Sequence, residues 1–195
     1  MVRSKDGGKT WSKREPLQKD YLGPVKNKPV MSRGRLIAPS SIESNGWRLY
    51  FEYSDDMGKT WQRTDYVEAD SITIEGKKKL KDLAIQPSII LLKDGRLAAL
   101  ARTRSEHIGI TYSEDNGKTW SKLKLIDTPN NNSGLDAVTL SDGNHVLICN
   151  DKPIPYGIKK GKGLRTPLSL MTSGDGESWQ HWMTLEDSPI SQYSY

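Results

Sequence analysis

The chain has 195 residues, a mild net charge of +5 and 34% hydrophobic residues, which is low for a globular domain. The basic run Lys77–Lys79 with Lys81 has no aromatic platform, so we interpret it as a solvated loop and expect no nucleic-acid partner. No stretch of the sequence is long and apolar enough to indicate a membrane partner. The only cysteine, Cys149, lies in an apolar run, which predicts a small core residue and excludes a disulfide framework.

A turn built from Ser, Asp, Gly and Trp occurs four times, at Ser4–Trp11, Ser54–Trp61, Ser113–Trp120 and, one residue shorter, Ser173–Trp179. The tryptophans are 50, 59 and 59 residues apart, and periods of this size are typical of propellers or solenoids. We expect the Asp carboxylate to fold back onto backbone N–H groups of its own turn, while Gly supplies a positive φ. The Trp should begin the outgoing strand and bury its ring between neighbouring sheets. These features predict a structural motif rather than a catalytic one.

The start of the chain is interpreted as a partial blade over residues 1–20. Trp11 to Leu17 is expected to be its outgoing strand, and residues 21–29 form a Gly- and Pro-containing loop. The first element is a turn that begins at Ser4, and the chain ends at Tyr195, where residues 190–195 would start another blade. We therefore expect an internal fragment of a longer protein.

Three complete units follow, each with four short strands bounded by turn residues. They span about 24–70, 84–128 and 132–187, with strands expected at 30–32, 35–41, 47–53 and 61–67, then at 86–92, 96–104, 107–112 and 120–126, and finally at 135–140, 145–150, 167–172 and 179–185. A long Lys- and Gly-rich loop covers 151–163. No segment has a convincing helical period, so the sequence predicts an all-β chain of propeller blades.

Several segments between the turns carry a family resemblance. They are Gly23–Pro29, Leu36–Ser41, Ile85–Ser88 with Ala101–Arg104, Asn132–Val138, Arg165–Leu170 and Tyr193–Tyr195. Together with the turns, they resemble the sialidase-like family of six-bladed β-propellers with Asp-box (BNR) repeats, especially its bacterial predicted-neuraminidase branch. The resemblance implies a glycosidase of the exo-sialidase type that needs no metal or organic cofactor. Its nucleophile would be a Tyr, because a carboxylate would be repelled by the acidic sugar, and arginines would bind the substrate carboxylate.

The resemblance assigns roles to individual residues. Tyr195 is the candidate nucleophile, with Tyr193 as the alternative, and Asp136 stands where sialidases carry the Glu that activates the Tyr. Arg165 stands where one arginine of the triad is expected, but Asn150 occupies the place of the second. The first arginine and the acid/base Asp of the family precede the first turn, so we predict that this chain alone lacks sialidase activity.

Other candidates come from their position on the strands. Arg102 and Arg104 alternate at the end of one strand and share a face, which favours substrate binding over a solvated or ion-paired surface role. Polar residues at innermost-strand ends facing a central funnel are candidate partners for sugar hydroxyls: Gln86, Asn132, Ser133 and Asn150. Asp136, within an apolar strand, requires an arginine partner or a site role. The three histidines, His107, His145 and His181, are dispersed and are expected on the surface or in loops.

The expected function is therefore glycoside hydrolysis of an acidic glycan or sialoside. Two alternatives stay open. A carbohydrate-binding propeller without catalysis is favoured by Asn150, and a polysaccharide lyase acting on uronic acids would need a His or Tyr base near an arginine. Sheet faces left uncovered by neighbouring blades leave self-association open. The sequence assigns no compartment.

Overall fold

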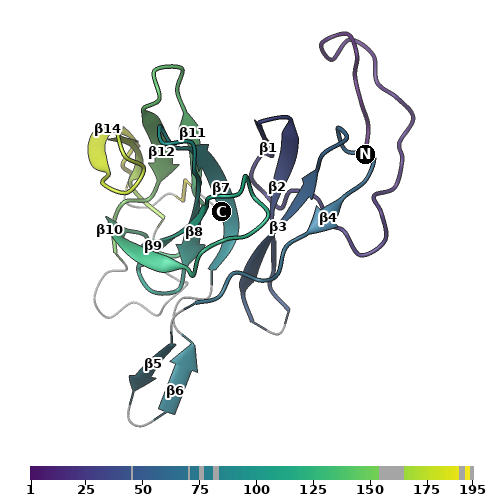
Figure 1. Ribbon diagram of the computed structural model, residues 1–195. Helices are drawn as coiled ribbons and strands as arrows, with labels where there is room; N and C mark the ends of the chain where they lie inside the picture. The colour runs from purple at the N-terminus through teal and green to yellow at the C-terminus, as the bar shows by residue number, and fades with distance from the viewer. Residues whose placement is uncertain are drawn as a thin grey trace.

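The structure, a computed structural model, describes residues 1–44, 46–69, 71–74, 77–80, 84–153, 165–188 and 192–193, with the backbone alone in 71–74 and 77–80. This part of the chain contains fourteen strands and no helix. The strands form three four-stranded antiparallel sheets and one two-stranded hairpin (Figure 1). The expectation of an all-β chain is confirmed.

Each four-stranded sheet is a meander in which consecutive strands pair. The first contains β1 (Val30–Ser32), β2 (Arg35–Ile42), β3 (Arg48–Ser54) and β4 (Gln62–Arg63); the second, β7 (Ala84–Leu91), β8 (Leu97–Thr103), β9 (His107–Ser113) and β10 (Lys124–Pro129); the third, β11 (Asp136–Thr139), β12 (His145–Cys149), β13 (Leu168–Ser173) and β14 (Gln180–Glu186). Strand β7 contacts β2 and β3 on one side and β11 on the other. The second sheet therefore lies between the other two, as in a series of propeller blades.

The strands β7, β8 and β9 of the second sheet are buried on both faces, and this explains their sequence. Ala98 and Leu100 of β8 belong to a core shared with the third sheet, whereas Leu97, Ala99 and Ala101 belong to a core shared with the first. A strand between two neighbours has no solvent face, so it carries a continuous apolar run instead of an alternating one.

The Asp-box turns adopt the hydrogen bonding expected from their residue types. In the second copy, the Asp56 carboxylate accepts hydrogen bonds from Ser54 Oγ at 2.8 Å and from the backbone N and Oγ1 of Thr60 at 2.8 and 2.7 Å. Gly58, with φ +81°, donates its backbone N–H to Ser54 Oγ at 2.7 Å, and its carbonyl accepts from Trp61 Nε1 at 3.2 Å. The backbone and side-chain hydrogen bonds from Thr60 hold the pKa of Asp56 well below its usual range. The predicted structural role of the motif follows from these bonds.

The tryptophans of the turns differ in burial. Trp61 is buried, and the Trp120 ring stacks on Phe51 of the first sheet, with ring centroids 3.6 Å apart and an interplanar angle of 14°. Trp179 packs against the core between the second and third sheets. Trp11 is 63% exposed, so the expectation of a buried ring was wrong for the first copy. Trp120 and Trp179 are thus partly buried against sheets of the described chain, whereas the Trp11 ring stays open to solvent.

Three sequence expectations need correction. Residues 11–17 form no strand: among the described residues, the main-chain hydrogen bonds of this segment with the first residues run from Ser12 N to Arg3 O and from Glu15 N to Met1 O, both at 2.8 Å, and from the amino terminus of Met1 to Glu15 O. The basic run 77–80 is not a loop: β6 (Lys77–Leu80) pairs with β5 (Ser71–Ile74) in a hairpin that projects from the sheets (Figure 1). His145 is fully buried in β12, where its Nδ1 lies 3.1 Å from Thr139 Oγ1.

Among the described residues, no helix has the length and apolar composition needed to cross a membrane.

Candidate functional site

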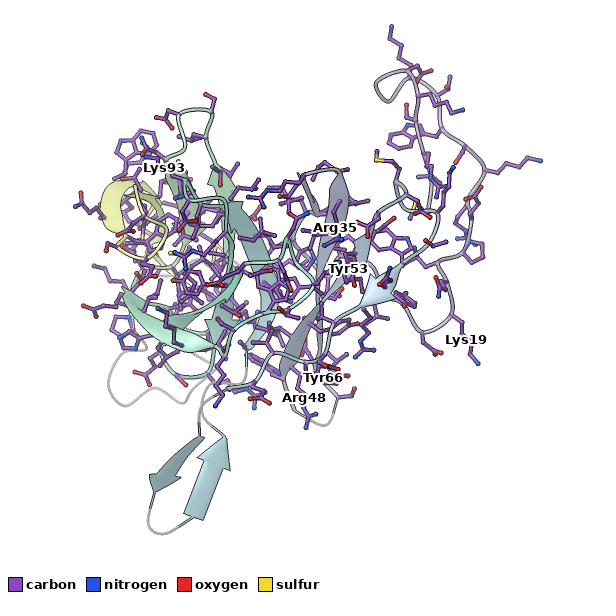
Figure 2. All side chains as sticks on the ribbon, in the orientation of Figure 1. Lys19, Arg35, Arg48, Tyr53, Tyr66 and Lys93 are labelled. Atoms are coloured by element: carbon purple, nitrogen blue, oxygen red, sulfur yellow. The ribbon has the colours of Figure 1, made fainter. Side chains whose placement is uncertain are left out.

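The candidate site lies at the end of the sheets opposite the Asp-box turns. Strands β7 and β11 begin at this end, and β8 and β12 finish there, so the polar residues at these strand ends come together. The two ends are marked in Figure 2 by side chains of the first sheet, with Arg35 near the Asp-box turns and Arg48 near the site end. Arg35 belongs to the structural end: it is ion-paired with Asp55 at 2.7 Å and donates to the carbonyl of Asn116 in another Asp-box at 3.0 Å.

The loop over residues 21–29 carries basic side chains into the site. It is fixed to the first sheet by Glu52 of β3, which is fully buried and whose carboxylate accepts backbone hydrogen bonds from Leu22 at 2.9 Å and Gly23 at 2.7 Å. The backbone N of Val25 donates to Pro39 O at 2.9 Å. A carboxylate that accepts two backbone N–H groups is well compensated for its burial. The loop is therefore held firmly where it leaves the first sheet.

Beyond this anchor, the loop contacts the second sheet through Asn27. The buried Asn27 side chain donates to the carbonyls of Gln86 and Pro87 at 2.8 and 3.1 Å. These two residues lie in a register shift of β7, where Ile85 pairs with Arg102 but Ser88 pairs with Leu100. Gln86 has φ +56°, and the irregularity re-aims its side chain. The Asn27 side chain thus supplies hydrogen bonds to two carbonyls that would pair with the neighbouring strand in a regular sheet.

Arg102 and Arg104 lie together, as their alternation on one strand predicts. The guanidinium carbon of Arg104 is 4.2 Å from the centroid of the Trp47 ring, and that of Arg102 is 5.0 Å away. Arg102 is buried and donates to Gln86 Oε1 at 3.3 Å, whereas Arg104 is exposed. Trp47 follows β2 in the first sheet, so the two arginines bridge two sheets at the site end.

Asp136 is ion-paired, but with a lysine rather than the arginine considered above. Its Oδ1 accepts from Lys28 Nζ at 2.9 Å, from Ser88 Oγ at 2.6 Å and from the backbone N of Ala137 at 2.9 Å. Partial burial raises the pKa of Asp136, but the hydrogen bonds from Ser88 and Lys28 lower it by more, so the net shift is downward. Asp136 is therefore held ionised, and a carboxylate stabilised in this way is a poor proton acceptor.

Lys26 lies at the edge of a depression of about 200 Å³ that Tyr193 and Asp136 also line. Its Nζ donates to Leu135 O at 2.8 Å and to Asn27 Oδ1 at 3.2 Å. Desolvation of the ammonium lowers the pKa of Lys26, Asp136 opposes this shift, and the neighbouring Arg102 and Lys28 add to it. The residue as a whole is exposed, so it is the charged end that is desolvated. The depression thus combines a cation, a phenol and a carboxylate.

The other predicted residues that the structure describes lie at the same end of the third sheet. Asn150 is fully buried, and its Nδ2 donates to Pro167 O at 2.6 Å. Arg165 lies beside Tyr193, whose backbone N donates to Arg165 O at 3.1 Å. Asn132 has φ +63° and is half-buried in the segment before β11. Tyr195 lies outside the described residues.

The structure brings Asp136 and Tyr193 to one depression, and it brings Gln86, Arg102 and Arg104 to the neighbouring strand ends. Sequence reasoning missed Lys26, Lys28 and Trp47. Two lysines on either side of an asparagine, in a loop leading into an innermost strand, were the available signal for the first two. In the part of the chain that the structure describes, no group of three or more His, Cys, Asp or Glu side chains could hold a metal ion.

Sheets in series, with Asp-box turns at one end and a polar site at the other, define a sialidase-like β-propeller. The model of the BNR repeat-like domain matches residues 1–195, and the chain belongs to this family.

Among curated proteins, the chain is similar to an anhydrosialidase of Macrobdella decora. The identity is 31% over an alignment of 217 positions, which covers 100% of this chain and 27% of that protein. It is also similar to a sialidase of Clostridium perfringens, with 29% identity over 170 residues covering 73% of this chain and 44% of that protein.

Solved structures show the same fold. The NanB sialidase of Streptococcus pneumoniae superimposes with a TM-score of 0.68 at 21% identity, covering 100% of this chain and 29% of that one. The intramolecular trans-sialidase of Ruminococcus gnavus gives a TM-score of 0.63 at 25% identity, covering 100% and 42%. The chain thus spans between about a quarter and a half of the length of these proteins.

Proposed function

We propose that this chain is part of a sialidase-like glycoside hydrolase that acts on acidic sugars, and that its site end binds the acidic sugar. The observation that carries the proposal is that Lys26 lies with Asp136 and Tyr193 at one depression, while Arg102 and Arg104 lie at the neighbouring strand ends of the same end of the sheets. Positive charge at a partly apolar depression suits an anionic sugar, whose carboxylate needs a cation and whose ring needs apolar contact. The relatives named sialidase or anhydrosialidase support a sialoside as the first ligand to test.

The proposed chemistry uses a tyrosine as the nucleophile, with Tyr195 as first candidate and Tyr193 as second. The phenol oxygen would form a bond to the anomeric carbon, its proton would pass to a neighbouring base, and the glycosidic bond would break as its oxygen is protonated. Asp136 is the candidate base, although its ion pair with Lys28 disfavours that role. The proposed ligand-binding residues are Arg102, Arg104, Arg165, Gln86, Asn132 and Asn150.

We further propose that the three sheets are blades spanning about 24–70, 84–128 and 132–187, with a partial blade at 1–20; the blade predicted to start at 190–195 lies mostly outside the described residues. The resemblance places the family's first arginine and its acid/base Asp before the first Asp-box turn, so the 195-residue chain alone should not turn over a fluorogenic sialoside. Hydrolysis by the purified chain, abolished by Tyr195→Phe or Tyr193→Phe, would contradict this expectation.

A second candidate is a carbohydrate-binding propeller without catalysis. Asn150 favours it, because a neutral, fully buried amide that donates to Pro167 O cannot supply the charge of a triad arginine. Product analysis separates the candidates. A released reducing sugar supports hydrolysis, an anhydro sugar without a reducing end supports intramolecular transfer, an unsaturated product absorbing in the ultraviolet supports a lyase, and retention on a glycan array without turnover supports a binder.

The two edge strands of the third sheet, β11 and β14, and the turn after β11 expose large apolar side chains, and we propose that these promote self-association. Val138, Leu140 and Trp182 are 41%, 44% and 60% exposed. Apolar surface of this kind favours contact with another protein surface. Sedimentation velocity should show the mass rising with concentration, and Trp182→Ser should reduce the rise; a monomer at every concentration would contradict the proposal.

A further inference from the structure

The resemblance expects an arginine where this chain has Asn150, so the acidic group of a ligand must meet a different cation. The Asn150 side chain is fully buried and is engaged with Pro167 O. An amide is a neutral donor, and its hydrogen bond to an anion is weaker than that of a charged group. The question is which basic side chain near this position keeps its charge available.

Lys28 is a poor candidate because its charge is already compensated. Its Nζ is ion-paired with Asp136 Oδ1 at 2.9 Å and also donates to Ala137 O at 2.9 Å. Arg102 and Arg104 lie against the Trp47 ring and are not among the residues that line the depression. They add positive electrostatic potential to the depression without contacting a ligand in it.

Lys26 differs in the nature of its partners. Its two hydrogen bonds among the described residues go to neutral oxygens, the carbonyl of Leu135 and the side-chain carbonyl of Asn27. An ammonium has three donors, so these bonds orient the group and leave one N–H direction for a ligand. Among the described residues no carboxylate is hydrogen-bonded to this ammonium, Asp136 acts on it only through space, and an incoming anion would add a directly bonded counter-charge.

The surroundings of Lys26 fit an acidic sugar rather than a bare ion. The depression beside it is lined by Leu135, Ile148, Leu168 and Tyr193 in addition to Asp136. Aliphatic and aromatic walls with one cation are the usual pattern of a pocket for an organic anion. The carbon face of a sugar ring can lie on these walls while its carboxylate points to the ammonium.

We propose that Lys26 is the specificity-determining residue of this site and that it binds the carboxylate of the acidic sugar in place of the family's second arginine. The proposal rests on the proposed function, because it assigns the anion-binding group of that same site. Loop 21–29 leaves the first sheet, contacts Gln86 and Pro87 of the second sheet through Asn27, and brings Lys26 to Leu135 beside the third sheet, where the ligand would bind.

The test measures binding by isothermal titration calorimetry with two probes, the methyl α-glycoside of N-acetylneuraminic acid and its carboxamide, which lacks the charge. The variants are Lys26→Gln, which removes the charge, and Lys26→Arg, which keeps it. Lys26 has φ +70°, and both replacements place the same kind of strain on the backbone, so they are matched. Lys118→Gln is the control for net charge, since Lys118 is exposed and belongs to an Asp-box turn at the opposite end.

Lys26→Gln should weaken binding of the acid by about tenfold or more and leave the carboxamide unchanged, because charge-assisted hydrogen bonds are worth more than neutral ones. Lys26→Arg should keep most of the preference for the acid, and Lys118→Gln should keep all of it. A wild-type preference that survives in Lys26→Gln, or is lost equally in Lys26→Arg, would overturn the assignment and leave the proposed function standing. Absence of binding of either probe to the wild-type chain would overturn the proposed function itself.

Discussion

Replacing Asp136 by asparagine should strengthen the binding of an acidic sugar. The substitution removes a negative charge from the wall of the depression and releases Lys28 from its ion pair, and both changes favour an incoming anion. If the lost repulsion acts through largely solvated surroundings, charges about 4 Å apart contribute on the order of 1 kcal/mol, which corresponds to about fivefold tighter binding.

The cost of this substitution to stability should be small. The side chains of Lys28 and Asp136 are 47% and 41% exposed, and ion pairs of such exposure contribute about 1 kcal/mol or less. The asparagine Oδ1 can still accept the hydrogen bond from Ser88 Oγ, which is 2.6 Å long in the wild type. The free energy of unfolding, measured in urea, should therefore fall by about 1 kcal/mol or less.

Calorimetric titration of a sialoside into both proteins checks the affinity. Asp142→Asn is the matched control, because it removes the same charge in the turn between β11 and β12, at the end opposite the site. Weaker binding in Asp136→Asn but not in Asp142→Asn would refute the reasoning, since it would show that the Asp136 carboxylate contacts the ligand favourably or positions the lysines.

Further predictions concern the framework that holds the site. Trp120→Ala should lower the free energy of unfolding by about 2–4 kcal/mol, whereas Trp11→Ala, at an exposed ring, should change it by about 0.5 kcal/mol or less; equal effects in urea titrations would contradict the account of inter-sheet packing. Gly117→Ala should destabilise more than Gly34→Ala, since both have positive φ but only the Cβ of the former would meet a side chain, at 2.8 Å; thermal melts that rank them in reverse would refute this. The pKa of Asp56 is lower in the folded than in the unfolded chain. The ionised carboxylate therefore stabilises the fold at any pH above its unfolded pKa of about 4, and this contribution is lost as the pH falls through the lower pKa of the folded state. The difference in melting temperature between wild type and Asp56→Ala should thus narrow on acidification, and a constant difference from neutral to acidic pH would contradict it.

Much of the fold could be predicted because its signals are local. The hydrogen bonds of an Asp-box close within a single turn, so its residue types determine its geometry. The unbroken apolar run Leu97–Ala101 likewise indicates a strand buried on both faces. Strand positions follow from such patterns even when no partner is known.

The errors in the fold concern features that depend on distant partners. A strand over 11–17 would need a neighbour to form a ladder, and the described residues give this segment only three main-chain hydrogen bonds with the first residues of the chain. A row of lysines is polar whether it is looped or paired, so composition did not reveal the hairpin of β5 and β6. His145 is polar but buried, because its ring lies beside Trp179 and Gly176 of the fourth Asp-box.

The candidate site could be predicted only where it depends on local sequence pattern. Arg102 and Arg104 share a strand face, and strand period alone brings them together. The pairing of Lys28 with Asp136 joins residues 108 positions apart, and no local pattern specifies it. Lys26 depends in addition on Glu52, a buried carboxylate that accepts backbone hydrogen bonds from Leu22 and Gly23 and so holds the loop that carries the lysine.

The most direct test of the central claim compares the affinity of the wild-type chain for a methyl sialoside and for its uncharged carboxamide. A cationic depression at the site end predicts that the acid binds about tenfold or more tightly, with a preference that weakens as salt is added. Equal affinity for the two probes, or binding of neither, would contradict the claim that this end of the sheets recognises an acidic sugar.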